Sequence, residues 1–300
     1  MEDAELLLGS GAWRCAVAPF GASLRRLWVE EPRRDVLWGY TGAGAKQGGQ
    51  GDVLVPWPGR IRGGAYPFDG IRHELPRNDK AGPNAIHGFA RSRSWTTERA
   101  AADRARFRLD VLPSDHPGYP FAVRVEVLYE LRRDGLRCTV HAANTGLQAA
   151  PFGAGFHPYI LPRQALGESV VQVPASLLVE RGADLLPTGR VQRVDGTPFD
   201  LRERQRLGDR VLDHTFTGLA RDAEGLAVVA VDDVEVWMDR GCGYLQLFTG
   251  DTLGPQARKA LAVEPMTCGP DAFNHPGLGL AVLRPGERLS ATWGIRLRAA

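Results

Sequence analysis

A strict alternation of apolar and polar residues is the feature of this sequence that most limits how it can fold. Across residues 123–131, Val, Tyr and Leu occupy every second position, and mainly Arg and Glu lie between them. After turn residues at 133–135, the alternation resumes over residues 136–142. Successive side chains of a β-strand point to opposite faces of a sheet, so this pattern predicts an antiparallel hairpin with one buried and one solvated face.

The same alternation recurs along the chain and extends the prediction to the whole protein. Further strands are predicted at residues 105–111, 226–231, 234–238, 244–248 and 289–297. The spacing typical of a long amphipathic helix is absent, and only a short helical turn is expected near Leu201–Leu207. The glycine-rich Thr41–Gly51 segment indicates a mobile loop rather than a linker, because strand patterns continue on both sides of it. We therefore predict one all-β domain over residues 1–300, a large antiparallel β-sandwich of two packed sheets.

The composition agrees with this class and argues against several functions. The hydrophobic share of 43% can fill a sizeable core, and a net charge of +2 gives no electrostatic reason to expect nucleic acid as a partner. The acidic N-terminal residues include no long apolar run, so we expect no signal peptide, no membrane partner and a cytoplasmic location. The four cysteines form no Cys-x-x-Cys pair, so we expect neither a zinc site nor a disulfide framework, and no metal.

One carboxylate near the C-terminus stands in a constrained position. Glu264 follows the apolar run 261–263 and precedes Pro265, and Pro270 lies further on. Proline fixes one backbone dihedral and forces extended geometry on the residue before it, so Glu264 is expected at the end of a strand beside a stiff loop. These residues alone fit either a surface glutamate or a partly buried general base.

Two histidines interrupt the alternation. His157 lies between Phe156 and Pro158, a setting that holds an imidazole in place and leaves its pKa open to adjustment. This setting fits a packed core histidine as well as a catalytic one. His87 lies between an apolar residue and a glycine, where a structural hydrogen-bonding role is the commoner explanation.

Two charged residues stand in turn-like segments. Arg60 follows a proline-rich stretch, and its planar guanidinium group can donate to hydroxyl groups, although by itself a surface arginine in a turn is the favoured explanation. Asp213 precedes His214 in a turn-rich region, where an aspartate either binds hydroxyl groups or caps a turn. Neither residue decides the function by itself.

Taken together, these segments resemble the aldose 1-epimerase (galactose mutarotase) family. The matching segments are Asn84-Ala85-Ile86-His87-Gly88, His157-Pro158-Tyr159, Asp213 before Phe216, Gln246 within Leu245-Gln246-Leu247-Phe248-Thr249-Gly250, and Glu264-Pro265-Met266-Thr267. Each is short, but all occur in the order typical of the family, and the match extends from Gly21-Ala22 to the last predicted strand. The resemblance implies a galactose mutarotase-like supersandwich and an isomerase that interconverts the α and β anomers of a free aldose.

The chemistry implied by this resemblance needs an acid and a base. Opening a cyclic hemiacetal removes a proton from the hydroxyl on C1 and delivers one to the ring oxygen. The resemblance implies Glu264 as the base and His157 as the acid, and reference pKa values of about 4.3 and 6.5 allow a carboxylate and an imidazolium near neutral pH. No redox step and no covalent intermediate is needed, so no cofactor is expected.

Sugar binding is expected to be polar and geometric. The resemblance implies that hydroxyl groups are held by Arg60, His87, Asp213 and Gln246, with Asn78 assisting. An aromatic residue, Phe273 or Trp57, is expected to stack on the apolar face of the ring. The expected partner is a small sugar, bound by a monomer or a homodimer.

The identity of the sugar stays open at this point. Residues 56–62 depart from the commoner Gly-Arg-x-x-Asn-Arg form of galactose mutarotases and look more like a bacterial branch of the family. One alternative is an enzyme acting on a hexose 6-phosphate or a sulfonated hexose, with an arginine pair for the anion, either Arg60 and Arg62 or Arg77 and Arg91. Another is a non-catalytic sugar-binding protein on the same fold, which is disfavoured because both the acid and the base are present.

Overall fold

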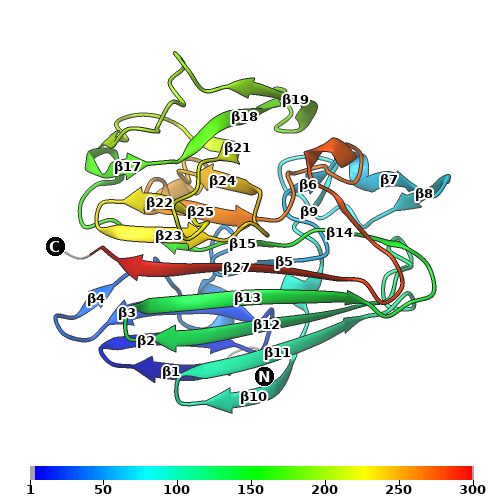
Figure 1. Cartoon of the computed structure of the whole chain (residues 1–300), viewed down its shortest axis with the longest axis horizontal. Coiled ribbons are helices and arrows are strands. Elements are labelled where there is room, and N and C mark those ends of the chain that lie inside the picture. The colour runs from blue at the N-terminus through cyan, green and yellow to red at the C-terminus, as the bar shows by residue number, and fades with distance from the viewer. Residues whose placement is uncertain (1–3, 299–300) are drawn as a thin grey trace.

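Two large antiparallel sheets make up the body of the protein and share its main hydrophobic core (Figure 1). The computed structural model describes residues 4–298. In spatial order, the nine-stranded sheet consists of β10 (Thr96–Ala101), β11 (Arg104–Val111), β12 (Val123–Arg132), β13 (Gly135–Asn144), β27 (Arg288–Leu297), β23 (Val234–Met238), β22 (Ala227–Val231), β17 (Val170–Gln172) and β20 (Gln205–Arg206). The eight-stranded sheet consists of β19 (Pro187–Arg193), β18 (Ala175–Arg181), β21 (Asp213–Leu219), β24 (Tyr244–Phe248), β25 (Leu261–Met266), β15 (Gly155–Phe156) and β5 (Val53–Leu54), with β16 (Tyr159–Ile160) also paired to β25. The predicted all-β antiparallel sandwich is confirmed.

Smaller sheets and short turns complete the fold. A four-stranded sheet contains β1 (Leu6–Ser10), β2 (Trp13–Ala18), β3 (Ser23–Val29) and β4 (Arg34–Asp35). Three two-stranded sheets pair β14 (Ala150–Phe152) with β26 (Ala281–Leu283), β6 (Arg60–Ile61) with β9 (Ala85–Ile86), and β7 (Ala65–Phe68) with β8 (Ile71–Glu74). The 3₁₀ turns are η1 (Ala43–Ala45), η2 (Arg62–Gly64), η3 (Ala90–Ser92), η4 (Leu166–Glu168), η5 (Gly254–Gln256) and η6 (Pro276–Leu278). Each helical segment that the structure describes is one such three-residue turn, far short of the length that a membrane-crossing helix requires.

The hairpin predicted from the alternating residues is present in the expected register. Strands β12 and β13 pair antiparallel from Val123 opposite Asn144 to Arg132 opposite Gly135. The alternating apolar residues from Val123 to Leu131 are buried, and the residues between them, which include Leu128, are partly or fully exposed. The alternation therefore predicted both the pairing and the buried face of the hairpin.

The helical turn expected near Leu201–Leu207 is wrong. Leu201 and Leu207 are both buried, but the segment between them forms bends and the short strand β20. Residues of β20 pair with β17 at the edge of the nine-stranded sheet. Pairing with β17 therefore satisfies the backbone hydrogen bonds of this segment. The two leucines are buried because they flank a strand, not because they lie on one face of a helix.

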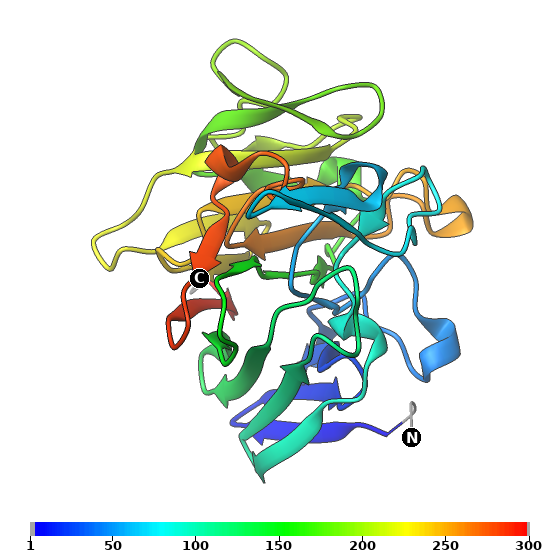
Figure 2. The ribbon, with the colours of Figure 1, turned by 90° about the vertical axis from the view of Figure 1, so that its right-hand side faces the viewer.

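The small sheets bring the N-terminal third of the chain against its C-terminal segment. Figures 1 and 2 show the segment containing β6 and β9 beside the segment that follows β25. The backbone N–H of Asp271 donates to the carbonyl of Arg60, and the Asp271 carboxylate accepts from the N–H of Arg62. This contact places the loop of Arg60 over the end of the eight-stranded sheet.

Candidate active site

One cavity of about 840 Å³, here named the Glu264 cavity, is lined by all the residues predicted for proton transfer and for hydroxyl binding. Its lining includes Arg60, Asn78, His87, His157, Asp213, Gln246 and Glu264. Its floor is one face of the eight-stranded sheet, because alternate residues of four neighbouring strands line it. These residues are Val179 and Arg181 of β18, Asp213 and Thr215 of β21, Gln246 and Phe248 of β24, and Glu264 and Met266 of β25. Loops around β6, β9 and the β15–β16 link supply the remaining predicted residues.

Glu264 lies inside β25 and not at the end of a strand, so that expectation is wrong. The strand continues through Pro265 to Met266 and pairs with β24 along its length. Pro265 lies opposite the interruption between β15 and β16, so its missing N–H removes no ladder hydrogen bond there. Glu264 is only 3% exposed, which excludes the surface glutamate.

Three polar side chains sit next to one another across three strands. Thr215 of β21 lies opposite Gln246 of β24, which lies opposite Glu264 of β25. The Thr215 hydroxyl donates to Gln246 Oε1, and Gln246 Nε2 donates to Asp213 Oδ1 at 2.7 Å. These two bonds fix the orientation of the Gln246 amide. Asp213 is the first residue of β21, so of the two roles considered for it, capping a turn is not the one found.

His157 is held against Glu264 at the link between β15 and β16. Its Nε2 lies 3.3 Å from Glu264 Oε1, and its side chain is 5% exposed. Its backbone N–H donates to the carbonyl of Asp52, and its ring stacks on the ring of Tyr159. The predicted acid and base therefore face each other in one cavity, although they are remote in the sequence.

Burial changes the protonation expected for this pair. It raises the pKa of the Glu264 carboxyl well above its ordinary value, and the Asp213 carboxylate adds to the effect. It lowers the pKa of His157 to about 3, and the charges of Arg91 and Lys46 act in the same direction. Both shifts favour the neutral forms, an uncharged imidazole and a protonated carboxyl group, whereas reference values favour the imidazolium and the carboxylate. Both forms hold the same number of protons, and one proton crossing the 3.3 Å contact interconverts them.

His87 is oriented by the backbone so that one ring nitrogen is left for a ligand. Its Nδ1 accepts a hydrogen bond from the N–H of Gly59 at 3.2 Å. Burial, with the neighbouring His157, lowers the pKa of His87 well below its ordinary value, so the neutral ring carries its proton on Nε2. Gly88 permits this placement, because its φ is +60° and a Cβ there would lie 1.9 Å from the carbonyl oxygen of Val55.

Arg60 and Asn78 are both engaged with neighbouring groups. Arg60 Nε donates to Asp79 Oδ2 at 2.8 Å, which holds the guanidinium group while its terminal nitrogens stay available. Asn78 bonds both the N–H and the carbonyl of Ile86 through its amide. Asn78 therefore positions β9, the strand that precedes His87.

The glycine-rich loop is packed against this site over its second half. Gln47, Gly48 and Gly49 line the Glu264 cavity, and the Tyr159 hydroxyl donates to the carbonyl of Gly48 at 2.7 Å. A Cβ at Gly49 would lie 3.1 Å from the His157 ring. The segment is a loop, as expected, and it forms part of the cavity wall.

Neither residue expected to form the aromatic wall lines the cavity. Trp57 and Phe273 are buried in the core, where their ring centroids lie 5.9 Å apart, and neither lines the Glu264 cavity. Its apolar surface comes instead from residues such as Ile86, Phe248 and Met266. Large aromatic residues in a sequence are more readily explained by core packing, and nothing in the local pattern set these two apart.

The sequence did not single out Arg181, Asp52 or Lys46 at this site, and it indicated Arg91 only as one member of a possible arginine pair. Arg181 lines the Glu264 cavity with Nη1 3.6 Å from Asp213 Oδ2, and this buried nitrogen has no hydrogen-bond partner. Arg91 Nη1 lies 3.4 Å from the buried carboxylate of Asp52, which Lys46 also contacts. These residues carry no local motif that separates them from surface charges. Within residues 4–298, no cluster of His, Cys, Asp or Glu is arranged to hold a metal ion.

Comparison with known proteins establishes the family. The aldose 1-epimerase family profile matches residues 5–296. The chain is 31% identical over 247 residues to the uncharacterized protein YihR of Escherichia coli (strain K12), covering 79% of this chain and 75% of that protein. It is 28% identical over 320 residues to galactose mutarotase of Homo sapiens, covering 95% of this chain and 92% of that protein. The solved structure of a GalM/aldose epimerase homologue from C. elegans matches the fold with a TM-score of 0.86 at 20% identity, covering 99% of this chain and 100% of that one.

The chain therefore belongs to the aldose 1-epimerase family. It is an epimerase, which places it among the isomerases.

Proposed function

We propose that this protein interconverts the α and β anomers of a free hexose, such as glucose or galactose, with Glu264 as the base and His157 as the acid. The observation that carries the proposal is the 3.3 Å contact between Glu264 Oε1 and His157 Nε2. Ring opening removes a proton from the C1 hydroxyl oxygen and adds one to the ring oxygen, and both oxygens are bonded to C1. An acid and a base that serve them must therefore be close neighbours, as these two groups are.

The reaction follows from one proton shared by the pair. Transfer of that proton from Glu264 to His157 gives the carboxylate and the imidazolium. The carboxylate then takes the proton of the C1 hydroxyl while His157 Nε2–H protonates the ring oxygen. The bond between C1 and the ring oxygen breaks, and the C1 carbonyl forms. After rotation about the C1–C2 bond, the reverse steps close the ring with the other configuration.

The remaining polar groups support binding of the sugar hydroxyls. His87 offers a donor through Nε2, and Arg60 offers donors through its terminal nitrogens. Asp213 accepts from hydroxyl groups while Gln246 holds it in place. Asn78 assists by holding β9.

Polarimetry on freshly dissolved α-glucose and α-galactose tests the proposal. Glu264→Gln and His157→Asn are each expected to lower the rate roughly 10²- to 10⁴-fold, because each removes one proton transfer. Glu224→Gln and His141→Asn make the same chemical changes at exposed positions and are expected to keep the rate. A near-normal rate in either site variant contradicts the role assigned to it. A protein that binds hexoses without accelerating their mutarotation would instead be a sugar-binding protein.

A hexose with an anionic substituent is a second candidate substrate, favoured by the charges around the Glu264 cavity. Cationic Arg60, Lys80, Arg91 and Arg181 line it, against the acidic residues Asp79, Asp213 and Glu264. Burial favours the protonated form of Glu264, and the Nη1 of Arg181 lacks a hydrogen-bond partner. The first feature lowers the negative charge that an anion would meet, and the second leaves a hydrogen-bond donor for the anion on Arg181, although this arginine lies 3.6 Å from the Asp213 carboxylate.

The arginine pairs expected from the sequence are not the ones that converge. Arg60 and Arg91 line the Glu264 cavity, whereas Arg62 pairs with Asp184 and Arg77 donates to the carbonyl of Gly63 outside it. Rates on glucose and glucose 6-phosphate, compared in the native protein and in Arg181→Gln, discriminate the two candidates. A charged substrate predicts a preference for the phosphate that Arg181→Gln removes.

A further inference from the structure

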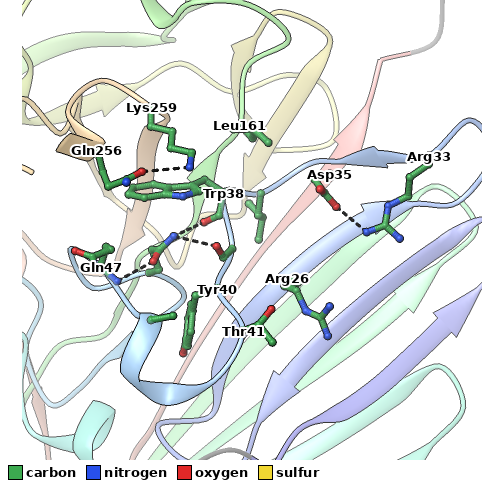
Figure 3. A pocket seen from close by; sticks show the side chains of 14 residues that line it. Arg26, Arg33, Asp35, Trp38, Tyr40, Thr41, Gln47, Leu161, Gln256 and Lys259 are labelled. Carbon is green, nitrogen blue, oxygen red and sulfur yellow. Dashed lines mark hydrogen bonds and ion pairs between the residues drawn. The ribbon is translucent and has the colours of Figure 1, made fainter.

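A second cavity, of about 670 Å³ and here named the Trp38 cavity, lies next to the site (Figure 3). The glycine-rich loop divides it from the Glu264 cavity. Gln47 lines both cavities, Gly48 and Gly49 line only the Glu264 cavity, and Ala45 and Gln50 line only the Trp38 cavity. The two cavities are therefore separate sites that share one wall.

The Trp38 cavity combines an apolar surface with neutral hydrogen-bonding groups. Leu37, Trp38 and Leu161 supply the apolar part of the lining. Gln47 and Gln256 are two of the neutral residues of this lining, and Figure 3 labels both together with Trp38. A ring with hydroxyl groups matches such a surface, because its carbon face packs on apolar atoms while amides bond its hydroxyls.

Cationic side chains outnumber acidic ones in this lining. Arg26 and Arg33 line the Trp38 cavity together with one carboxylate, Asp35. Arg26 is paired with Glu5, and Arg33 lies 3.1 Å from Asp35. The acidic groups of this region are thus already engaged with arginines.

Lys259 is the cation left for a ligand. Its Nζ donates to the neutral Gln256 Oε1 at 3.2 Å and lies 5.4 Å from the centre of the Trp38 ring. Among the residues of the described chain, it has no carboxylate partner. An ammonium group beside an apolar surface, without a counter-charge, favours an oxyanion.

A small hydrophobic cluster connects the two cavities. Its members include Trp38 and Tyr159, whose rings meet edge-on at 5.3 Å, with Phe248 and Leu253 packed against them. Trp38 lines the Trp38 cavity, whereas Phe248 and Leu253 line the Glu264 cavity. A ligand that packs on Trp38 therefore contacts the same hydrophobic cluster as Tyr159, whose ring stacks on His157.

From these contacts we propose that the Trp38 cavity binds a small anionic ligand that carries hydroxyl groups, of the chemical class of sugar phosphates. Lys259 binds the anionic group, the amides of Gln256 and Gln47 bond hydroxyl groups, and Trp38 packs against the ring. The volume lies within the range of small-molecule sites, roughly 300–1,000 Å³. The binding is independent of the sugar that the Glu264 cavity turns over.

Calorimetric titration of the full chain with glucose 6-phosphate, glucose and inorganic phosphate tests this site. Lys259→Gln is expected to weaken binding of glucose 6-phosphate at least tenfold at one site per chain. Gln256→Ala, which keeps the charge, is expected to weaken it several-fold. The matched control is Lys80→Gln, which removes the same charge at the Glu264 cavity and leaves this site unchanged.

Three results would overturn the proposal. One is the absence of glucose 6-phosphate binding at millimolar concentration. Another is binding that Lys259→Gln leaves unchanged while Arg181→Gln weakens it, because the ligand then occupies only the Glu264 cavity. The third is inorganic phosphate binding as tightly as glucose 6-phosphate, which would mean that the hydroxyl-bearing ring is not recognised. Melting temperatures of the Lys259 and Gln256 variants, exposed and half-buried positions respectively, verify that they are folded.

Discussion

The ring of Tyr159 lies against the ring of His157, with centroids 4.9 Å apart and 20° between the planes. The Tyr159 hydroxyl donates to the carbonyl of Gly48, in the loop that forms one wall of the Glu264 cavity. One side chain therefore holds the imidazole from the side and fastens the loop. Two substitutions separate these contributions.

Tyr159→Phe keeps the ring and removes the hydroxyl group. The Gly48 carbonyl, which belongs to an exposed residue, then loses its protein donor, and the lost hydrogen bond costs about 0.5–1.5 kcal/mol of loop stability. We expect KM to rise several-fold with kcat nearly unchanged, because the loop contributes to binding more than to proton transfer. Steady-state polarimetry on a free hexose measures both constants.

Tyr159→Leu removes the ring that packs on His157. We expect kcat to fall about 10- to 100-fold, because a small displacement of a catalytic group is costly in rate. The pH profile of kcat should shift as well, since the imidazole becomes more solvated. Equal effects of the Phe and Leu variants on kcat would contradict the positioning role of the ring, and thermal melting checks that both variants fold.

Thr215 fixes which way the Gln246 amide points. Thr215→Val removes the hydroxyl that donates to Gln246 Oε1, so the amide is free to turn away from Asp213. We expect KM for the hexose to rise about five- to tenfold, which corresponds to the free energy of about one hydrogen bond. The kcat value should change little. Thr217→Val on the same strand removes a bond to Gly243 outside the Glu264 cavity and serves as the control. A change in kcat without a change in KM would refute this role.

The long strands could be predicted from the sequence because apolar and polar residues alternate where a strand has one buried and one solvated face. The hairpin of β12 and β13 shows this register over ten residues of each strand. The short strands that hold the site, such as β6, β9, β15 and β16, have two residues each and therefore no period to detect. Their positions depend on pairing with distant segments, which no local pattern encodes.

The candidate site residues were found through the resemblance to a family and not from their own surroundings. Glu264 is an example, because the sequence placed it at a strand end, whereas pairing on both sides of β25 buries it in the sheet. Arg181 could not be predicted from the sequence. Its role depends on a buried nitrogen that lies near Asp213 without a hydrogen bond, and only the three-dimensional packing places it there. The opposite pKa shifts of His157 and Glu264 likewise follow from burial, which reference pKa values do not include.

Stability should fall in acid because His157 is buried as a neutral imidazole. Its pKa is lowered from 6.5 to about 3 in the folded protein. A lowered pKa means that the full stability is present above about pH 6.5 and is lost as pH falls toward 3, since the unfolded chain takes up the proton first. The loss from this one group reaches about 2 kcal/mol at pH 5. Urea unfolding at pH 7.5 and pH 5 should show this loss in the native protein and a smaller loss in His157→Asn. An equal loss in both proteins would contradict the burial of a neutral ring.

Glu264 should affect stability with the opposite sign. Burial raises the pKa of its carboxyl well above its ordinary value of about 4.3, so between these two pKa values the folded protein holds a proton that the unfolded chain releases. A raised pKa gives stability that is full below about pH 4.5 and is lost as pH rises through the folded value. Glu264→Gln keeps the shape of the side chain and cannot ionise, so this variant should be more stable than the native protein at pH 8 although it is inactive. The difference in urea midpoint should shrink at pH 5, where the native carboxyl group is protonated in a growing share of unfolded chains too. The control variant Glu224→Gln, at an exposed position, should change the urea midpoint little at either pH. If Glu264→Gln were instead less stable than the native protein at pH 8, the Glu264 carboxyl group would be ionised in the folded protein.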